Sequence, residues 1–580
     1  MAQGALVRSL VYQRRWRLRD FSVERAAAIA RELGCSAPLA RVLAARAPDS
    51  PAELLNYEIS QLHSPWELLG VREAVLRIDR ALRQGEKIFI QGDFDVDGIT
   101  STALLYKALR ALGAQGVKVD LSDRERGHGL SDTVIRRLKD EGFSLLITAD
   151  CGISEGEFIA HLQEHGIDVI VSDHHHPPAK LPPAYAIINP KQPGCSYPNK
   201  DLAAVGVAFQ LVRALYEHRG LPPQACEEFL DLVLLGTVGD LVPLVRDGHA
   251  ENKRLVAQGL RRIAQGQMCL GLRVLLEKLS LDPQRLTTGE VSYIIVPKLN
   301  AANRVGDPRD AFMLLVTALP SKAEALAAKL LAYNQDRQIA QDDLLFQAEE
   351  QLHSQSNWQS EKLIFLAGQY WNPGLIGLVA SDLAEKYYRP TVLVSIEDEI
   401  SRASCRSIPG FDIIEALERH SELFERYGGH AMAAGFSIRT ERLSILRERL
   451  RAYAREVLRD LGDPVHELEA ELSPEEITLE TYTDLMRLAP FGMGHPTPRF
   501  LLRSAKIKEL RTVGNGSQHL KLKVEAGGRE FSAIGFSLGE FAYEVERAGT
   551  VGLAFKLGCD TWTGRPQVQL EIEDILEPSA

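Results

Sequence analysis

From residue 87 onward, short apolar segments rich in β-branched residues alternate with amphipathic stretches. The segments KIFIQG, VKVDL, SLLITAD, DVIVSD and YAIIN are apolar throughout, as are strands buried on both faces of a parallel sheet. Between two of them, residues 99–113 place Leu105, Leu109 and Leu112 on one helical face and end at Gly113. This alternation predicts a doubly wound α/β domain over residues 81–250.

The rest of the chain shows three further patterns. Residues 1–80 have helical apolar spacing, and residues 251–355 are also predicted to be helical. Within the latter, residues 321–354 contain no Pro or Gly, which predicts one long helix between domains. A second α/β region covers residues 356–461. Strict alternation of apolar and polar residues then predicts a small antiparallel β-barrel or sandwich over residues 465–580.

Composition limits the class of protein. A chain of 580 residues is too long for one core and suggests three or four domains. The net charge of −11 excludes a basic surface over the whole molecule, although a local basic groove is compatible with it. The seven cysteines form no CxxC pair, which favours reduced thiols. No apolar run is long enough for a signal peptide or a spanning helix, so we expect a cytoplasmic protein with no membrane contact.

Acidic and histidine residues follow several predicted strands directly. In open α/β sheets, ligands bind beyond the carboxyl ends of the strands, so these side chains should meet at one edge. Carboxylates and neutral imidazoles suit Mn²⁺ or Mg²⁺, and their number exceeds what one ion needs, which indicates two-metal hydrolysis of a phosphoester. The residues are Asp93, Asp95, Asp97, Asp150, Asp173, His174, His175 and Asp240.

Other interpretations compete for some of these residues. For Asp240 taken alone, a helix N-cap or a turn residue is the favoured interpretation. The DFDVDG segment begins like a calcium-binding loop, but a strand precedes it and the twelfth position is Leu104 rather than Glu, which excludes that loop. A surface tract is the alternative for the three histidines. Their position after a β-branched strand, with Asp173 before them, favours a site.

Five motifs in the same order carry a resemblance. SDHHH, PKLNAANRVGD, SCRSIPGFDI, YGGHAMAAGFS and APFGMGHPTPRF are similar to motifs of the DHH phosphoesterase superfamily and, within it, of the RecJ family of single-strand-specific exonucleases. The resemblance runs from about residue 60 to the end. It implies a DHH domain, a long connecting helix, a DHH-associated domain and an oligonucleotide-binding β-barrel (OB-fold). It also implies 5′→3′ degradation of single-stranded DNA to 5′-mononucleotides with two Mn²⁺ or Mg²⁺ ions.

The resemblance assigns roles residue by residue. It implies that Asp150 bridges two metal ions, and that His175 contacts the scissile phosphate or assists proton transfer. Asp93 and Asp173 are expected to orient the ligands. The implied metal ligands are Asp95, Asp97, Asp150, His174 and Asp240. The implied substrate contacts are Ser404 and Arg406 for the 5′-phosphate, Arg304 and Arg124 as further cations, and Gly428, Gly429 and His430 as a backbone-lined pocket; a solvated surface charge is the alternative for any single Arg.

Some positions depart from the family pattern. Gln91 stands where many relatives have His, Asn303 where Gly is usual, and Asn372-Pro373 where His and an acidic or amide residue are common. In the C-terminal domain, every second residue of one strand is basic and lies on the same face: His519, Lys521 and Lys523. This pattern indicates binding of nucleic acid. Two aromatics of that domain, Phe531 and Phe536, are assigned to its core rather than to a stacking platform.

The leading hypothesis is therefore a metal-dependent exonuclease for single-stranded DNA in repair and recombination. One alternative is a DHH phosphodiesterase acting on short oligonucleotides or small nucleotides; the C-terminal barrel argues against it. Another is an inactive nucleic-acid scaffold; the complete set of motif carboxylates argues against it. The resemblance further suggests single-strand-binding protein and a helicase as partners, and a monomer is the default state. The sequence does not distinguish Mn²⁺ from Mg²⁺ as the metal, or a nuclease that cuts only DNA from one that also cuts RNA.

Overall fold

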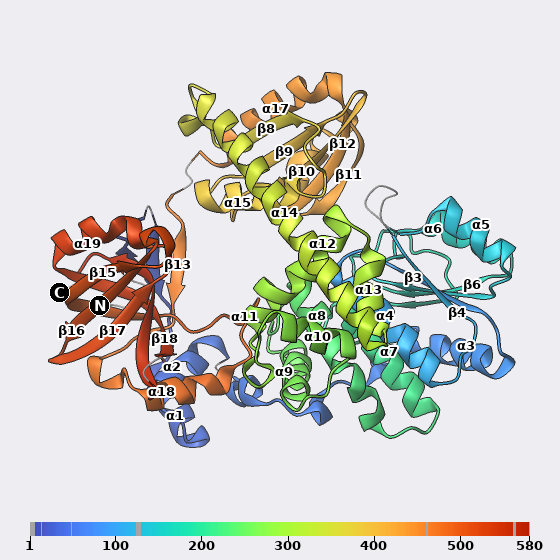
Figure 1. Ribbon diagram of the computed structural model, residues 1–580, viewed down its shortest axis with the longest axis horizontal. Helices are drawn as coiled ribbons and strands as arrows, with labels where there is room; N and C mark the ends of the chain where they lie inside the picture. Colours follow the sequence, from blue (N-terminus) through green and yellow to red (C-terminus); the bar gives the residue numbers. More distant parts are fainter. Residues whose placement is uncertain are drawn as a thin grey trace.

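The computed structural model describes residues 6–12, 14–47, 49–122, 129–459, 462–560 and 564–578. Three lobes are arranged around a central gap (Figure 1). The first lobe contains the strands predicted after residue 87, the second is the α/β region near residue 400, and the third is a β-barrel at the C-terminus. The two ends of the chain both lie on the barrel lobe.

The first lobe is built on five parallel strands in the order β4-β3-β5-β6-β7. Helices α3, α4 and α7 cover one face and α5 and α6 the other, because the strand side chains contribute alternately to two apolar cores. The chain leaves β3 toward β4 and then returns to the other side of β3 at β5, which creates a crevice between β3 and β5 at their carboxyl ends. The bounds are β3 Ile88–Gly92, β4 Val117–Leu121, β5 Leu145–Ala149, β6 Asp168–Ser172, β7 Ala186–Ile188, α3 Val71–Gln84, α4 Val96–Ala111, α5 Asp132–Asp140, α6 Gly156–Glu164 and α7 Ala204–His218.

Helices follow the sheet and end in a long connector. The predicted helix at 321–354 is confirmed as α14, Pro320–Ser354. Its first half packs Leu330 into the core of the first lobe, and its second half packs Leu344 and Leu352 into the core of the second. One rigid helix therefore fixes the two lobes relative to each other. The helices before it are α8 Leu230–Gly239, α9 Glu251–Ala264, α10 Leu270–Lys278, α11 Thr288–Glu290, the π-helical turn η6 Val291–Ile295, α12 Val296–Val305 and α13 Pro308–Val316.

The second lobe is a mixed five-stranded sheet in the order β11-β12-β10-β9-β8. Its β8–β9 pair is parallel and the other pairs are antiparallel. Helix α15 packs on one face, and α16 and α17 pack on the other. The bounds are β8 Ile364–Gln369, β9 Thr391–Ile396, β10 Ile400–Arg406, β11 Phe424–His430, β12 Ala433–Arg439, α15 Ile376–Tyr387, α16 Ile413–Glu418 and α17 Leu443–Val457.

The predicted C-terminal barrel is confirmed. Strands follow the order β15-β16-β17-β19-β18, and β15 also pairs with β18, which closes the barrel. Alternating residues such as Leu520, Leu522 and Val524 point into its core. The bounds are β15 Phe500–Val513, β16 His519–Ala526, β17 Arg529–Gly535, β18 Thr550–Asp560, β19 Gln567–Leu576, α18 Leu479–Leu485 and α19 Ala542–Ala548; α1 Val23–Leu33 and α2 Ala37–Arg46 share the barrel's core.

The prediction that residues 1–80 are helical is wrong for the first part of that range. Strands β1 (Leu6–Arg8) and β2 (Arg15–Leu18) form a hairpin, and β2 also pairs with β13 (Val465–Leu468). Trp16 is buried, and its indole Nε1 donates a hydrogen bond of 2.7 Å to Asp574. Strand β13 and Asp574 both come from the far end of the chain, so the local pattern contained no signal for these contacts.

Candidate metal centre

The loop after β3 presents three aspartates within five residues. Asp95 is the N-cap of α4, where its Oδ1 accepts hydrogen bonds from the backbone N–H groups of Asp97 (2.9 Å) and Gly98 (3.1 Å). Asp93 accepts a hydrogen bond from the Ser122 hydroxyl. A Cβ atom at Gly98 would lie 2.6 Å from the carbonyl oxygen of Asp93, so only glycine allows this tight turn.

Asp97 and Asp240 face each other from two helices. The Asp97 carboxylate accepts hydrogen bonds from the backbone N–H groups of Ala204 (2.6 Å) and Val205 (2.9 Å) at the start of α7. Gly236 on α8 lets the two helices approach, because a Cβ there would lie 2.7 Å from Asp97 Oδ1. Asp240 is the C-cap of α8 and not an N-cap: its backbone ends the helix while its side chain faces the site.

Two further strand ends complete the cluster. Asp150 follows β5 with a φ of 66°, a left-handed conformation that is strained for a residue other than glycine and is typical of functional sites. Asp173 follows β6, and its Oδ1 accepts hydrogen bonds from His174 N (2.7 Å), His175 N (3.0 Å) and His175 Nδ1 (2.7 Å). Its Oδ2 accepts another from Ile153 N (3.0 Å). Both carboxylate oxygens of Asp173 are therefore occupied by hydrogen bonds from the backbone and from His175.

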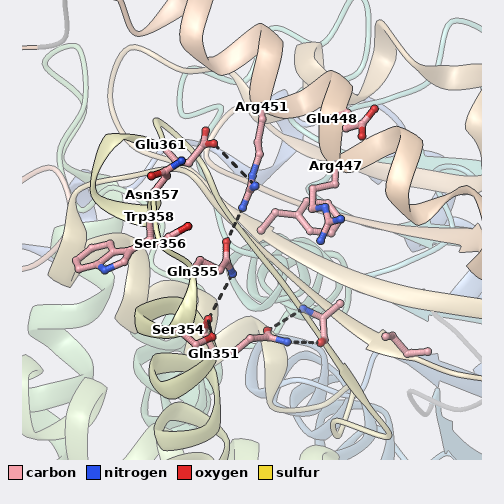
Figure 2. A pocket seen from close by; sticks show the side chains of 13 residues that line it. Gln351, Ser354, Gln355, Ser356, Asn357, Trp358, Glu361, Arg447, Glu448 and Arg451 are labelled. Carbon is pink, nitrogen blue, oxygen red and sulfur yellow. Dashed lines mark hydrogen bonds and ion pairs between the residues drawn. The ribbon is translucent and has the colours of Figure 1, made fainter.

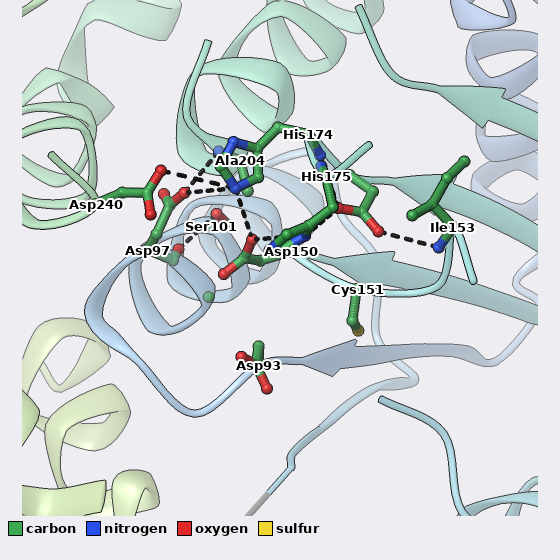
Figure 3. Close-up of polar contacts among 12 residues, drawn as sticks. Asp93, Asp97, Ser101, Asp150, Cys151, Ile153, His174, His175, Ala204 and Asp240 are labelled. Atoms are coloured by element: carbon green, nitrogen blue, oxygen red, sulfur yellow. Dashed lines mark hydrogen bonds and ion pairs between the residues drawn. The ribbon is translucent and has the colours of Figure 1, made fainter. Parts of the chain in front are cut away.

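The side chains converge around His174 (Figure 3). Its Nε2 lies 3.3 Å from Asp150 Oδ1, 3.7 Å from Asp240 Oδ2 and 4.0 Å from Asp97 Oδ2. Among the described residues, donor atoms within 4.8 Å of one another form three overlapping groups, with Asp150 and His174 each in two of them. The groups are Asp150-His174-His175, Asp97-His174-Asp240 and Asp93-Asp95-Asp150. Asp93 thus belongs to a donor group, although its expected role was only to orient ligands.

The electrostatics of the cluster fit divalent cations. Burial, reinforced by neighbouring carboxylates, raises the pKa of Asp97 and of Asp150 well above the usual range and raises the pKa of Asp240 to about 7. Asp150 Oδ1 is buried without a hydrogen-bond donor among the described residues. Several carboxylates kept this close together are stable as anions only next to positive charge, and oxygen donors with one imidazole suit Mn²⁺ or Mg²⁺.

The two histidines are held in different protonation states. Burial lowers the pKa of His174 to about 3, so its imidazole is neutral and available as a metal ligand. Burial also disfavours charge on His175, but the hydrogen bond and negative charge of Asp173 outweigh it and raise the pKa of His175 to about 9. At neutral pH, His175 is therefore a cation at the edge of the cluster, with its side chain half exposed.

A pH-dependent response to metal follows from these shifts. The carboxylates have a higher pKa in the folded than in the unfolded state, so the metal-free protein is stabilised at low pH and loses that stability as pH rises through about 7. Divalent cations bind the ionised carboxylates and so restore the stability that the metal-free protein loses at higher pH. We expect Mn²⁺ to raise the melting temperature by several degrees more at about pH 8 than at about pH 5.5. Scanning fluorimetry with Mn²⁺ or chelator measures this; equal increments at both pH values would contradict it.

The second lobe contributes a compact cationic pocket at the start of α15. The Arg406 guanidinium donates from Nε to Ser381 Oγ (3.0 Å) and from Nη1 to Ser404 Oγ (3.1 Å) and the Cys405 carbonyl (2.8 Å). A Cβ at Gly377, in the first turn of α15, would lie 2.9 Å from Ser404 Oγ and 3.1 Å from Arg406 Nη2. A guanidinium, hydroxyl groups and a glycine-bearing helix N-terminus together have the chemistry of a phosphate-binding site. We call Arg406, Ser404, Ser381 and Gly377 the Arg406 pocket.

Residues of PKLNAANRVGD join this pocket to the metal loop. Arg304 Nη1 donates to the carbonyl of Gly374 (2.7 Å), just before α15. Asn303 Nδ2 donates to the carbonyl of Phe94 (3.1 Å), between Asp93 and Asp95. The departure from Gly at 303 therefore adds a hydrogen bond that positions the metal-binding loop. Asn300 was not among the predicted site residues; its Oδ1 accepts a hydrogen bond of 2.9 Å from Val96 N.

The remaining predicted residues are placed as follows. His430 meets His176 with ring centroids 5.6 Å apart, so the two lobes touch beside the metal cluster. A Cβ at Gly429 would lie 2.4 Å from the Ala433 carbonyl oxygen, which restricts this position to glycine. Gln91 is buried in β3, where its amide donates to the Gly92 carbonyl (3.2 Å). Arg124 lies outside the described residues.

Other departures and omissions have local explanations. Asn372 Oδ1 accepts a hydrogen bond of 2.8 Å from Gly374 N and so shapes the turn into α15. Lys191 is a half-buried cation that the motifs did not indicate. Burial lowers the pKa of Lys191, and the negative charges of Asp201, Asp240 and Asp173 offset part of this effect. Lys191 is therefore a neighbour of the metal cluster. Its loop has no distinctive spacing, so only the fold could reveal it.

A cavity of about 800 Å³ lies elsewhere, at the β8 edge of the second lobe between α14 and α17 (Figure 2). Amide side chains line it together with Arg447 and Arg451. Arg451 already donates to Gln355 Oε1 (2.8 Å) and lies 3.9 Å from Glu361. Its lining residues do not overlap the metal cluster or the Arg406 pocket, so the cavity has no part in the chemistry described above.

A switch-point cluster of aspartates and histidines on a parallel sheet defines a metal-dependent phosphoesterase of the DHH type. Residues 87–237 match the model of the DHH family, N-terminal domain, residues 360–456 the DHHA1 domain, and residues 468–574 the RecJ OB domain. The chain belongs to the RecJ family. It is 34% identical over 572 residues to the single-stranded-DNA-specific exonuclease RecJ of Bacillus subtilis, covering 97% of this chain and 71% of that protein.

Two further similarities agree with this. The RecJ of Escherichia coli is 35% identical over 561 residues, which is 93% of this chain and 95% of that protein. The crystal structure of RecJ from Thermus thermophilus in complex with Mn²⁺ has a TM-score of 0.82 and 31% identity, and the match covers 97% of this chain and 80% of that one. Among the described residues, no helix combines the length and apolar character required to cross a membrane.

Proposed function

We propose that the protein is a single-stranded-DNA-specific exonuclease that degrades from the 5′ end and releases 5′-mononucleotides, in DNA repair and recombination. The observation that carries the proposal is one continuous site. A cluster of metal donors on the first lobe touches the second lobe through His176 and His430, and Arg304 links it to the Arg406 pocket. The names of the RecJ relatives support the substrate.

In this proposal the carboxylates of the cluster and His174 hold two divalent ions. Mn²⁺ or Mg²⁺ at these positions would supply an activated water and neutralise charge on the phosphate. Asp150, shared by two donor groups, is assigned the bridging position, and Asp93 joins Asp95 and Asp150 as a ligand. His175 has its Nδ1 engaged by Asp173, which leaves Nε2 as the atom that donates a hydrogen bond or a proton to the substrate phosphate.

The Arg406 pocket gives the reaction its direction. A terminal 5′-phosphate docked on Arg406 and Ser404 sets the end of the strand at a fixed distance from the metal cluster, so the same linkage is cut in each cycle. Arg304, Gly429 and His430 are proposed to contact the intervening phosphates, and Arg124 remains a proposed basic contact. A guanidinium suits this role because its donors meet phosphate oxygens in parallel pairs.

The barrel is proposed to hold the rest of the strand. Arg511 and Lys521 lie opposite each other on β15 and β16, whereas Lys523 is neutralised by Glu530 at 2.8 Å. Phe531 is buried as predicted, but the assignment of Phe536 to the core is wrong: 59% of it is exposed, because it follows the end of β17 rather than lying within the strand. Single-strand-binding protein and a helicase stay as proposed partners, with the enzyme as a monomer.

Digestion of an end-labelled strand tests the function. A 5′-phosphorylated single strand with a 3′ label is incubated with the full chain and Mn²⁺ or chelator, and products are resolved over time. We expect mononucleotides and a shrinking labelled strand only with metal. An intact strand alongside cleaved dinucleotides would favour the small-substrate alternative, and binding without cleavage under any metal would favour the scaffold.

Replacement of Arg406 tests the phosphate pocket. We expect Arg406→Ala to reduce kcat/KM on 5′-phosphorylated strands by about 10- to 100-fold, because one charge-assisted contact to phosphate is lost. Strands with a 5′-hydroxyl should lose much less, since they do not fill the pocket. Arg402→Ala on the same strand β10 is the matched control. Equal losses on both kinds of end would remove Arg406 from end recognition.

A further inference from the structure

Tyr293 is the most exposed large apolar side chain among the residues that the structure describes, with 83% of it accessible. It lies in the π-helical turn η6 between α11 and α12. Such turns are rare and concentrate at functional sites. A single exposed tyrosine is ordinary by itself, so its neighbours decide whether it has a role.

On one side, this turn is tied to the barrel. The Thr288 hydroxyl in α11 donates a hydrogen bond of 2.6 Å to the carbonyl of Phe491, in the segment that leads into the barrel. Figure 1 shows α11 on the side of the first lobe that faces the barrel. Tyr293 therefore lies on the bridge between these two lobes.

On the other side, the turn is tied to the metal cluster. Val296 packs against α8 at Gly239, with its methyl carbons 3.4 Å from where a Cβ of that glycine would be, and the next residue is Asp240. Asn300 on α12 holds the backbone of Val96 in the metal loop. The bridge therefore lies between the metal cluster and the barrel.

Two other exposed apolar side chains flank the bridge. Leu241 directly follows Asp240, is 55% exposed and has a φ of 59°, a left-handed conformation that is unfavourable in a residue other than glycine. Met493 is 54% exposed, and its carbonyl accepts a hydrogen bond of 2.8 Å from Leu244 N. We call Leu241, Tyr293 and Met493 the apolar strip.

We propose that the apolar strip is a base-stacking platform for unpaired nucleotides on the 3′ side of the cleaved phosphate, with Tyr293 as its central residue. The inference rests on the proposed function, because a strand with its 5′ end at Arg406 crosses the metal cluster before it reaches the strip. An aromatic ring with aliphatic neighbours binds the flat face of a base in any sequence. Paired bases have both faces covered by their own stack, so the platform also selects single strands over duplexes.

Fluorescence of 2-aminopurine tests the proposal without turnover. Single strands carrying this base at successive positions from a 5′-phosphate are bound to the full chain in the presence of chelator, where no cleavage occurs. We expect strong quenching at one or two neighbouring positions in the wild type and in Tyr293→Phe, which keeps the ring. In Tyr293→Ala the quenching should disappear and the strand should bind about tenfold more weakly.

Controls separate this result from other failures. Tyr543→Ala removes another exposed ring (71%), on α19, and should change neither signal. The increment in melting temperature with Mn²⁺ must be intact in Tyr293→Ala, which establishes that the metal cluster is undisturbed. Undiminished quenching in Tyr293→Ala would overturn the platform, whereas a wild type that does not digest single strands would overturn the proposed function instead.

Discussion

Replacing Asp150 should abolish cleavage without weakening the fold. Asp150 is shared by two donor groups, so its loss affects both proposed metal positions at once. We expect Asp150→Ala and Asp150→Asn to reduce kcat by at least about a thousandfold, since metal ions contribute several kcal/mol to such reactions. Initial rates of mononucleotide release in saturating Mn²⁺ measure the effect.

Stability separates this loss from misfolding. Asp150→Asn keeps the size of the side chain and tolerates its positive φ, while it removes one of several crowded negative charges. The metal-free variant should therefore melt at or above the temperature of the metal-free wild type. Asp336→Asn, on the exposed face of α14, is the control and should retain full activity. Activity of Asp150→Asn near the wild-type level would end the two-metal assignment.

Replacing His175 should lower the rate by about 10²- to 10⁴-fold, the usual contribution of a positioned acid or base. Its imidazole is held by Asp173 and carries a proton at neutral pH because its pKa is about 9. His175→Ala should leave binding of the strand nearly unchanged, so the loss should fall on kcat. Steady-state rates across a range of strand concentrations separate kcat from KM.

The pH profile distinguishes a chemical role of His175 from a structural one. Asp173→Asn removes the negative charge that sustains the high pKa of His175, so the pH at which activity declines should move downward. A change in that direction is expected only if the protonated imidazole takes part. His165→Ala, on an exposed part of α6's C-terminal end, is the matched control. An unchanged profile in Asp173→Asn, or full activity in His175→Ala, would remove His175 from the mechanism.

Much of the first lobe could be predicted because its signals are local. A strand buried on both faces of a sheet must be apolar throughout, and the aspartates follow such strands directly. The parallel direction of those strands then required the residues after β3, β5 and β6 to meet at one edge. The long helix could also be predicted from a local signal, because a run without Pro or Gly contains no residue that would end a helix.

Two features of the barrel lobe show where local reasoning failed. The hairpin of β1 and β2 is stabilised by β13 and by Asp574, which are far away in sequence. Because these partners are absent from the local pattern, the two short strands were included in the helical region predicted over residues 1–80. Phe536 follows directly after β17 and is out of phase with its buried residues Phe531 and Ala533, so its ring is exposed. Where an element ends is decided by its partners, which the local pattern does not contain.

The sequence by itself determined the α/β class, the order of the lobes and the identity of the residues with metal chemistry, because these depend on side-chain type and local periodicity. Only the tertiary structure decided how those residues are shared. It placed Asp93 in a donor group, made Asp240 both a helix C-cap and a member of a donor group, and linked the start of α15 to the loop after β3 through Arg304 and Asn303. Such contacts join segments hundreds of residues apart, and packing of whole lobes fixes them.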